Sequence, residues 1–186
     1  MKRKLILLVV LVLTAVPSMA YAQRSRPVTA VIENLQYVNL GQTSTGIRNG
    51  KMGIDTRGLQ ATAVLACNGD ADCAAAGLDG AQVQMQQNLQ IVIDVIGAGV
   101  VNGRSRTTLI ILDQSGESEL VRLRFRSQIR GTAFKGTDEE LQAVFVLPGL
   151  GRAGTRLNLE LAGTLIPGSS SSLQWQSLAG SGTLSR

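Results

Sequence analysis

The sequence predicts an all-β fold, with an antiparallel β-sandwich as the preferred architecture and a closed β-barrel as the alternative. The strongest sign is the segment 82–97, in which apolar residues alternate with a polar series rich in glutamine. Because successive side chains of a strand point to opposite faces, such a long alternation fits a half-buried strand and no helix. An apolar run at 109–112 and a second alternation over 121–130 complete a predicted centre of three strands. The 21 glycines and the unequal strand lengths favour the sandwich.

The first 22 residues have the features of a secretory signal peptide. Three basic residues at 2–4 precede an apolar run over 5–16, and an Ala-Tyr-Ala site favours cleavage before Gln23. The apolar run is too short to span a bilayer comfortably. We therefore expect an exported protein, periplasmic or extracellular after cleavage, with residues 23–186 forming one domain and no transmembrane segment in the mature chain.

Most of the formal net charge of +5 comes from this leader. It holds three of the 18 basic residues and none of the 13 acidic ones, so the mature charge falls to +2. Binding of a polyanion needs a concentrated basic surface rather than a near-neutral total. The bulk charge therefore gives no reason to expect a nucleic-acid partner.

The mature chain begins with a predicted strand over 28–40. Its apolar phase shifts at Glu33-Asn34, which indicates a bulge or bend there. Residues 41–58 are polar and rich in turn formers, so loops are expected, with Asn49-Gly50 as a two-residue hairpin turn. Residues 59–66 are predicted as another strand, although their alanines leave a helix open.

Cys67 and Cys73 form an even pair in a chain predicted to be exported, and we expect a disulfide between them. A single helical turn is predicted over 70–77, with Asp70 capping its start and Gly77 its end. A redox role would need CxxC spacing beside a βαβ pattern, and this sequence has neither. We interpret the disulfide as structural.

The same loop carries oxygen-bearing side chains at the alternate spacing of calcium loops. They are Asn68, Asp70, Asp72 and Asp79. The match is poor, because Cys73 stands where an EF-hand needs glycine and no bidentate glutamate follows. We expect a capped, disulfide-tied turn without a metal or cofactor, and calcium is the alternative.

Three more strands are predicted over 141–147, 155–166 and 173–184. In the second of these, leucines at 157, 159, 161 and 165 alternate with polar residues and are expected to face the core. The connecting segments are short and rich in glycine and serine, which is typical of turns.

The chain contains no histidine, which excludes Ser-His-Asp and Cys-His mechanisms and every His-ligated metal site. A pair of carboxylates could still hydrolyse a glycoside. The candidates are Asp94, Asp138, Glu139 and Glu140. However, only five aromatic residues follow the leader, too few for a typical sugar-stacking cleft. We interpret 138–140 as a solvated turn and expect no enzymatic activity.

Four arginines on the segment 121–130 form the candidate binding site. They are Arg122, Arg124, Arg126 and Arg130. Residues two apart on a strand share a face about 6.6 Å apart, so these guanidinium groups would form a row. The apolar residues between them are expected to face the core: Val121, Leu123, Phe125 and Ile129.

Two interpretations of this row compete. The preferred one is an exposed strand face whose charges pair with acidic residues on neighbouring strands, such as Glu117, Glu119 or Glu160. The other is capture of an anionic polysaccharide, a lipid headgroup or an acidic protein surface.

These observations together predict a non-enzymatic, exported module that binds or builds something in the cell envelope. The main alternative is a self-assembling subunit of an extracellular filament or surface layer, in which residues 28–40 pair with the sheet edge of a neighbouring subunit. A carboxylate-dependent glycoside hydrolase is the third interpretation.

Overall fold

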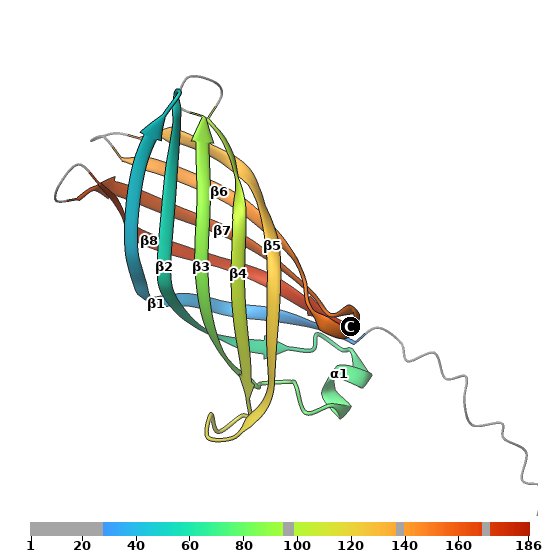
Figure 1. The fold of residues 1–186 in the computed structure, drawn as a ribbon. Coiled ribbons are helices and arrows are strands. Elements are labelled where there is room, and N and C mark those ends of the chain that lie inside the picture. Colours follow the sequence, from blue (N-terminus) through green and yellow to red (C-terminus); the bar gives the residue numbers. More distant parts are fainter. Residues whose placement is uncertain (1–27, 95–98, 137–139, 169–171) are drawn as a thin grey trace, which may run out of the picture.

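In the computed structural model the chain forms a closed barrel of eight antiparallel strands, each paired with its neighbours in sequence, with β8 returning to β1 (Figure 1). The structure describes residues 28–94, 99–136, 140–168 and 172–186, so the predicted signal peptide over 1–22 lies outside it. The strands are β1 (Thr29–Arg48), β2 (Lys51–Ala66), β3 (Gln82–Asp94), β4 (Val100–Leu112), β5 (Glu119–Lys135), β6 (Leu141–Leu150), β7 (Arg156–Pro167) and β8 (Leu173–Ser185). The two short helices are α1 (Ala71–Ala75) and the 3-10 turn η1 (Arg152–Gly154).

The all-β prediction is confirmed, but the preferred sandwich is wrong, because one continuous sheet closes on itself. Glycines inside the strands explain the difference. A side chain at Gly131 of β5 would clash with the backbone of Val144 and Phe145 on β6. One at Gly180 of β8 would clash with the Glu160 carbonyl on β7. Glycines of this kind let strands bend at close approach, which barrel closure requires.

The bend predicted in β1 is confirmed at Asn34, which has a φ of +54°. The pairing of β1 shifts register there with both β2 and β8. The predicted hairpin turn is also confirmed, since Asn49 and Gly50 both have positive φ, as a type I′ turn requires.

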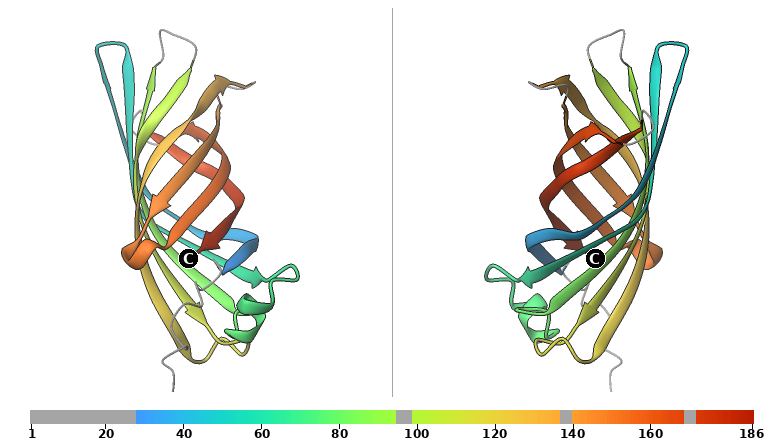
Figure 2. Two further views of the ribbon diagram at one scale, coloured as in Figure 1. Left: turned by 90° about the vertical axis from the view of Figure 1, so that its right-hand side faces the viewer. Right: turned by 90° about the vertical axis from the view of Figure 1, so that its left-hand side faces the viewer.

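The loops expected over 41–58 are largely absent, because β1 runs to Arg48 and β2 starts at Lys51 with continuous pairing between them. This hairpin projects beyond the rest of the barrel (Figure 2). Most of its side chains from Gly41 to Arg48 are exposed or only partly buried. Because residues 41–48 have no buried face, their sequence has no apolar alternation and resembles that of a loop, whereas Ile54 and Thr56 of β2 are buried.

Apolar side chains fill the barrel interior, and the alternation predicted for β3 and β7 is confirmed. In β3 every second residue from Val83 to Ile93 is buried. The four leucines of β7, at 157, 159, 161 and 165, are at most 1% exposed. In β5 Phe125 and Ile129 are buried as expected and Leu123 is half-buried. Val121 is 36% exposed, so the prediction that it faces the core is wrong.

The connection between β2 and β3 lies at the end of the barrel where β4 turns into β5, and it carries α1 (Figure 1). Cys67 and Cys73 form the predicted disulfide. The Asp70 carboxylate caps α1 by accepting hydrogen bonds from the Asp72 and Cys73 amides, both at 3.0 Å, which confirms the predicted cap. Its second oxygen accepts from the Thr29 amide at 3.0 Å and so ties α1 to the start of β1.

Across the described ranges, no helix has the length and apolar character needed to cross a membrane.

Candidate functional site

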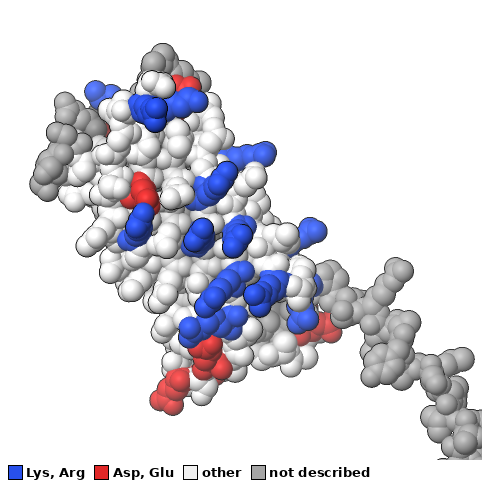
Figure 3. Space-filling model, viewed as in Figure 1, with Lys and Arg blue, Asp and Glu red and all other residues white. Residues whose placement is uncertain are grey.

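Six arginines project from the outer surface of the two adjacent strands β4 and β5, and we call this surface the arginine face. Its members are Arg104, Arg106, Arg122, Arg124, Arg126 and Arg130. All six are exposed, because the residues between them in the alternation point inward or lie at the barrel rim. Basic side chains gather on this side of the barrel, where few acidic ones lie (Figure 3). The predicted row on β5 is therefore one half of a wider basic surface.

The register of β4 and β5 places Arg106 directly opposite Arg126. Arg104 lies opposite Gln128, and Arg124 opposite Thr108, so neither of these arginines faces an acid on the partner strand. Directly opposed residues of an antiparallel pair have their Cβ atoms about 4.5–5.5 Å apart, and like charges at such positions destabilise the sheet. The pair therefore has a cost to folding that an anion between the two side chains would remove.

Acidic neighbours neutralise only part of this surface. Arg122 pairs with Glu119 at 2.7 Å, on the same strand rather than across the sheet. This hydrogen bond lowers the pKa of the Glu119 carboxyl and raises that of Arg122. Glu160, another expected partner, lies on β7 opposite Val146 instead.

In the described part of the chain, the other five arginines of the face form no ion pair. The pairing expected across the sheet is therefore not found for Arg122, whose acidic partner lies on its own strand, nor, in the described residues, for Arg124, Arg126 and Arg130.

The outer surface around Arg106 and Arg126 is hollowed. Two adjoining hollows, of about 1200 and 780 Å³, share Asn88 and Leu150 in addition to these two arginines. The larger hollow reaches Arg156 on β7. An extended partner lying in them would contact several guanidinium groups at once.

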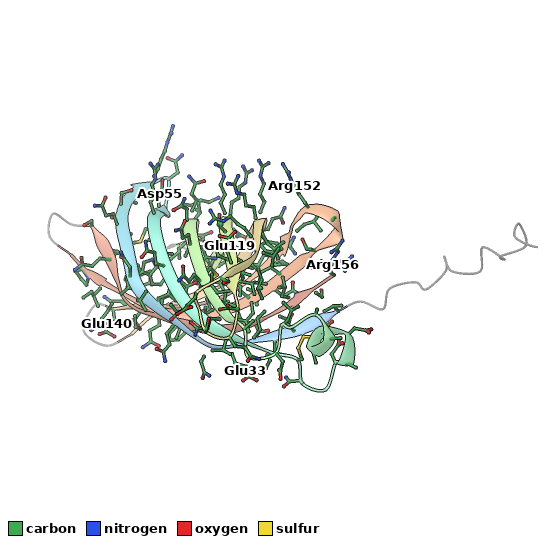
Figure 4. The ribbon with its side chains drawn as sticks, turned by 90° about the horizontal axis from the view of Figure 1, so that it is seen from below. Glu33, Asp55, Glu119, Glu140, Arg152 and Arg156 are labelled. Atoms are coloured by element: carbon green, nitrogen blue, oxygen red, sulfur yellow. A yellow bond between two sulfur atoms is a disulfide. The ribbon has the colours of Figure 1, made fainter. Side chains whose placement is uncertain are left out.

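Of the four acidic residues labelled in Figure 4, only Glu33 and Glu140 lie away from the basic side. Arg152 and Arg156 lie toward the side from which the arginine side chains project, whereas Glu33 and Glu140 lie on the opposite side (Figure 4). Asp55 lies on the basic side, where it pairs with Arg57 at 3.1 Å. The barrel thus has one side with an excess of positive charge despite its modest net charge.

A polar cluster inside the barrel was not predicted. Tyr37 donates to Gln87 Oε1 at 2.6 Å, and Gln87 Nε2 donates to Ser105 Oγ and Thr107 Oγ1 at 3.2 and 3.0 Å. Burial raises the pKa of the Tyr37 phenol. Ser127, opposite Ser105, has a buried hydroxyl that finds no hydrogen-bond partner among the described residues. The cluster contains no carboxylate, amine or thiol, so it lacks a general acid or base that works near neutral pH.

Two of the four residues of the calcium alternative, Asp70 and Asp79, use their carboxylates to bind backbone amides. Asp70 accepts from three amides, as described above, and Asp79 accepts from the Cys67 amide at 2.9 Å. No group of three or more acidic or cysteine side chains in the described ranges is arranged to hold a metal ion.

The carboxylates considered for glycoside hydrolysis are only partly described. Asp138 and Glu139 lie outside the described residues. Asp94 ends β3, and Glu140 precedes β6 at the same end of the barrel, away from both hollows of the arginine face.

Arg104 and Arg106 were missed from the sequence, because 100–108 was not recognised as a strand. Asn102 and Gly103 interrupt its apolar pattern, and the inward positions 105 and 107 are hydroxyl residues. The available signal was the spacing of two between Arg104 and Arg106, which matches the spacing on β5.

A scan against protein-family models and searches of curated proteins and of solved structures found no match.

Proposed function

We propose that the protein is a non-enzymatic, exported binding module of the cell envelope that holds an anionic partner on its arginine face. The observation that carries the proposal is the direct opposition of Arg106 and Arg126 without a neutralising acid in the described residues. A disulfide is typical of proteins in oxidising compartments, which supports export.

Arginine suits this role because its planar guanidinium binds phosphate, sulfate or carboxylate groups through two parallel hydrogen bonds. On the arginine face such groups would repeat at about 6.6 Å along each strand and about 4.8 Å between strands. A partner with closely spaced negative charges would engage both strands and relieve the repulsion between them.

The test compares two double variants. One carries Arg106→Gln and Arg126→Gln, and the matched control carries Arg48→Gln and Arg186→Gln. Both variants remove two exposed positive charges, but the control residues lie outside β4 and β5. We expect the first variant to elute from heparin, used as a model polyanion, at clearly lower salt than the wild type, and the control to elute close to it. Equal elution of the two variants would reduce the proposal to non-specific charge attraction.

The filament alternative has less support. Residues 29–36 of β1, which would pair with a neighbouring subunit, already pair with β8, and those from Val31 onward also pair with β2. Strand addition at this segment would require the barrel seam to open. Size-exclusion chromatography over a range of concentrations tests this alternative, which predicts species larger than a monomer.

A further inference from the structure

We propose that the anionic partner is a phospholipid membrane surface, on which the barrel lies with β5 and β6 against the headgroups. This inference rests on the proposed function and names the class of its partner. It starts from β6, the strand next to the arginine face.

The outward side of β6 is an exposed apolar strip, which comprises Val144, Val146, Pro148 and Leu150. The exposed fractions of its aliphatic residues are 50% for Val144, 43% for Val146 and 64% for Leu150. The inward residues of β6 are also apolar, so this strand is apolar on both faces. Four successive outward apolar side chains extend over about 20 Å, which is unusual for a strand facing water.

Residues of the apolar strip are direct cross-strand neighbours of arginines. Leu150 lies opposite Arg126 on β5 and opposite Arg156 on β7, so it stands between two arginines. Val146 lies opposite Arg130 on one side and Glu160 on the other. Two of the four residues of the apolar strip thus have an arginine beside them on β5, and the β7 side carries Arg156 and one carboxylate, Glu160. Exposed apolar patches rimmed by polar residues commonly mark protein or membrane contacts.

A bilayer surface offers binding partners for both the arginines and the apolar strip within a few ångströms of depth. Its phosphates accept hydrogen bonds from guanidinium groups, and the acyl boundary beneath them receives aliphatic side chains. A polysaccharide gives Val146 and Leu150 no comparable gain, because saturated side chains lack the aromatic face on which sugar rings stack. A second copy packed strip to strip would bring two rows of arginines together, which charge repulsion opposes.

The test measures flotation with phosphatidylcholine vesicles, with and without phosphatidylglycerol, alongside retention on heparin. Val144→Thr with Val146→Thr changes two residues that line neither hollow, and it should weaken binding to the anionic vesicles about tenfold and leave heparin retention unchanged. Arg124→Gln with Arg126→Gln should weaken both. The control Val38→Thr with Ile47→Thr removes exposed aliphatic side chains from β1, outside the apolar strip, and should change neither.

Any other combination of binding results on the two probes contradicts a specific part of the inference. If the Val144 and Val146 variant binds vesicles like the wild type while the arginine variant fails on both probes, the proposed function stands and the membrane partner is wrong. If the Val144 and Val146 variant lost binding to vesicles and to heparin equally, a role of the apolar strip in lipid binding would also be rejected. An arginine variant that binds both probes normally would overturn the proposed function as well. If the wild type were a dimer that does not bind vesicles, and the Val144 and Val146 variant were a monomer, a second copy of the chain would be identified as the partner that covers the apolar strip.

A gain-of-signal variant provides an independent readout. Leu150→Trp adds an indole at a position of the apolar strip that is 64% exposed, and its emission should shift to the blue when anionic vesicles are added. The same shift should not occur with heparin. An emission maximum that vesicles leave unchanged would contradict insertion of this residue.

Discussion

The indole nitrogen of Trp175 donates a 3.0 Å hydrogen bond to Thr56 Oγ1 and so connects β8 to β2 inside the barrel. These strands are not neighbours, since β1 lies between them. The contact lies where backbone pairing between β1 and β8 has ended, because that pairing extends only from Thr29 to Gln36 on β1. Beyond Gln36, side chains such as Trp175 hold this part of the seam together.

Replacing Thr56 with valine should therefore destabilise the protein by about 1–3 kcal/mol, because the buried indole N–H loses its acceptor. Thr56→Ser is the matched control, since it keeps the hydroxyl and loses only a methyl group. Urea unfolding followed by the fluorescence of Trp175, the chain's single tryptophan, measures both variants. Equal stability of the two would show that the hydrogen bond contributes nothing.

Removing the disulfide by changing Cys67 and Cys73 together to alanine should lower stability by about 2 kcal/mol, because the closed loop is short. The barrel should still form, since its strands are paired independently of this loop. A thiol titration of the native protein should find neither cysteine free. Retention of heparin binding by the double alanine variant would agree with a purely structural disulfide, and its loss would contradict it.

The Asp70 carboxylate should make stability depend on pH in the acid range. Its pKa is lowered in the folded protein, chiefly by the hydrogen bond from the Cys73 amide and then by that from the Thr29 amide. A carboxyl whose folded pKa is depressed contributes stability above its unfolded value of about 3.9, and this contribution is lost as the pH falls through the folded value.

Asp70→Asn should consequently lower the melting temperature at pH 7, with a difference from the wild type that narrows as the pH falls below about 4. Thermal unfolding of both proteins across this range measures the difference. A gap that stays constant with pH would mean that the charge of Asp70 does not contribute.

The positions of most strands could be predicted, but the long β1–β2 hairpin, the first part of β4 and the closure of the sheet could not. Alternation in β3 and β7 shows which side chains are buried, because a strand with one buried face must alternate. It does not show whether that face packs on a second sheet or on the far wall of the same one. Gly131 and Gly180 were counted as evidence for irregular loops, whereas they lie inside strands, where they let neighbouring backbones approach. Composition alone does not separate these two uses of glycine.

The candidate site could be predicted for β5 and not for β4. The row from Arg122 to Arg130 follows from spacing along one strand, but the opposition of Arg106 and Arg126 depends on the register between two strands. The Asp113 side chain orders the turn between these strands by accepting from Ser115 Oγ at 2.7 Å and from the Glu117 amide at 3.0 Å, and the pairing then shifts between Ile111 and Leu112 before it reaches the arginines. A shift of one residue in the pairing would have moved every arginine of one strand to the other face.

The repulsion between Arg106 and Arg126 leads to the last prediction. Arg106→Glu converts a directly opposed like-charge pair into an opposite-charge pair, which should raise stability by about 0.5–1 kcal/mol at low salt. The gain should shrink in 1 M salt, where the Debye length falls to about 3 Å. Arg48→Glu, in the β1–β2 hairpin and opposite Lys51, makes the same charge change outside the arginine face. Urea unfolding at low and high salt should show that Arg106→Glu gains stability. Retention on heparin should show that the same variant loses binding. If Arg106→Glu lost both heparin binding and stability, Arg106 would be a residue that stabilises the barrel. It would then not be a destabilising residue that serves to bind an anionic partner.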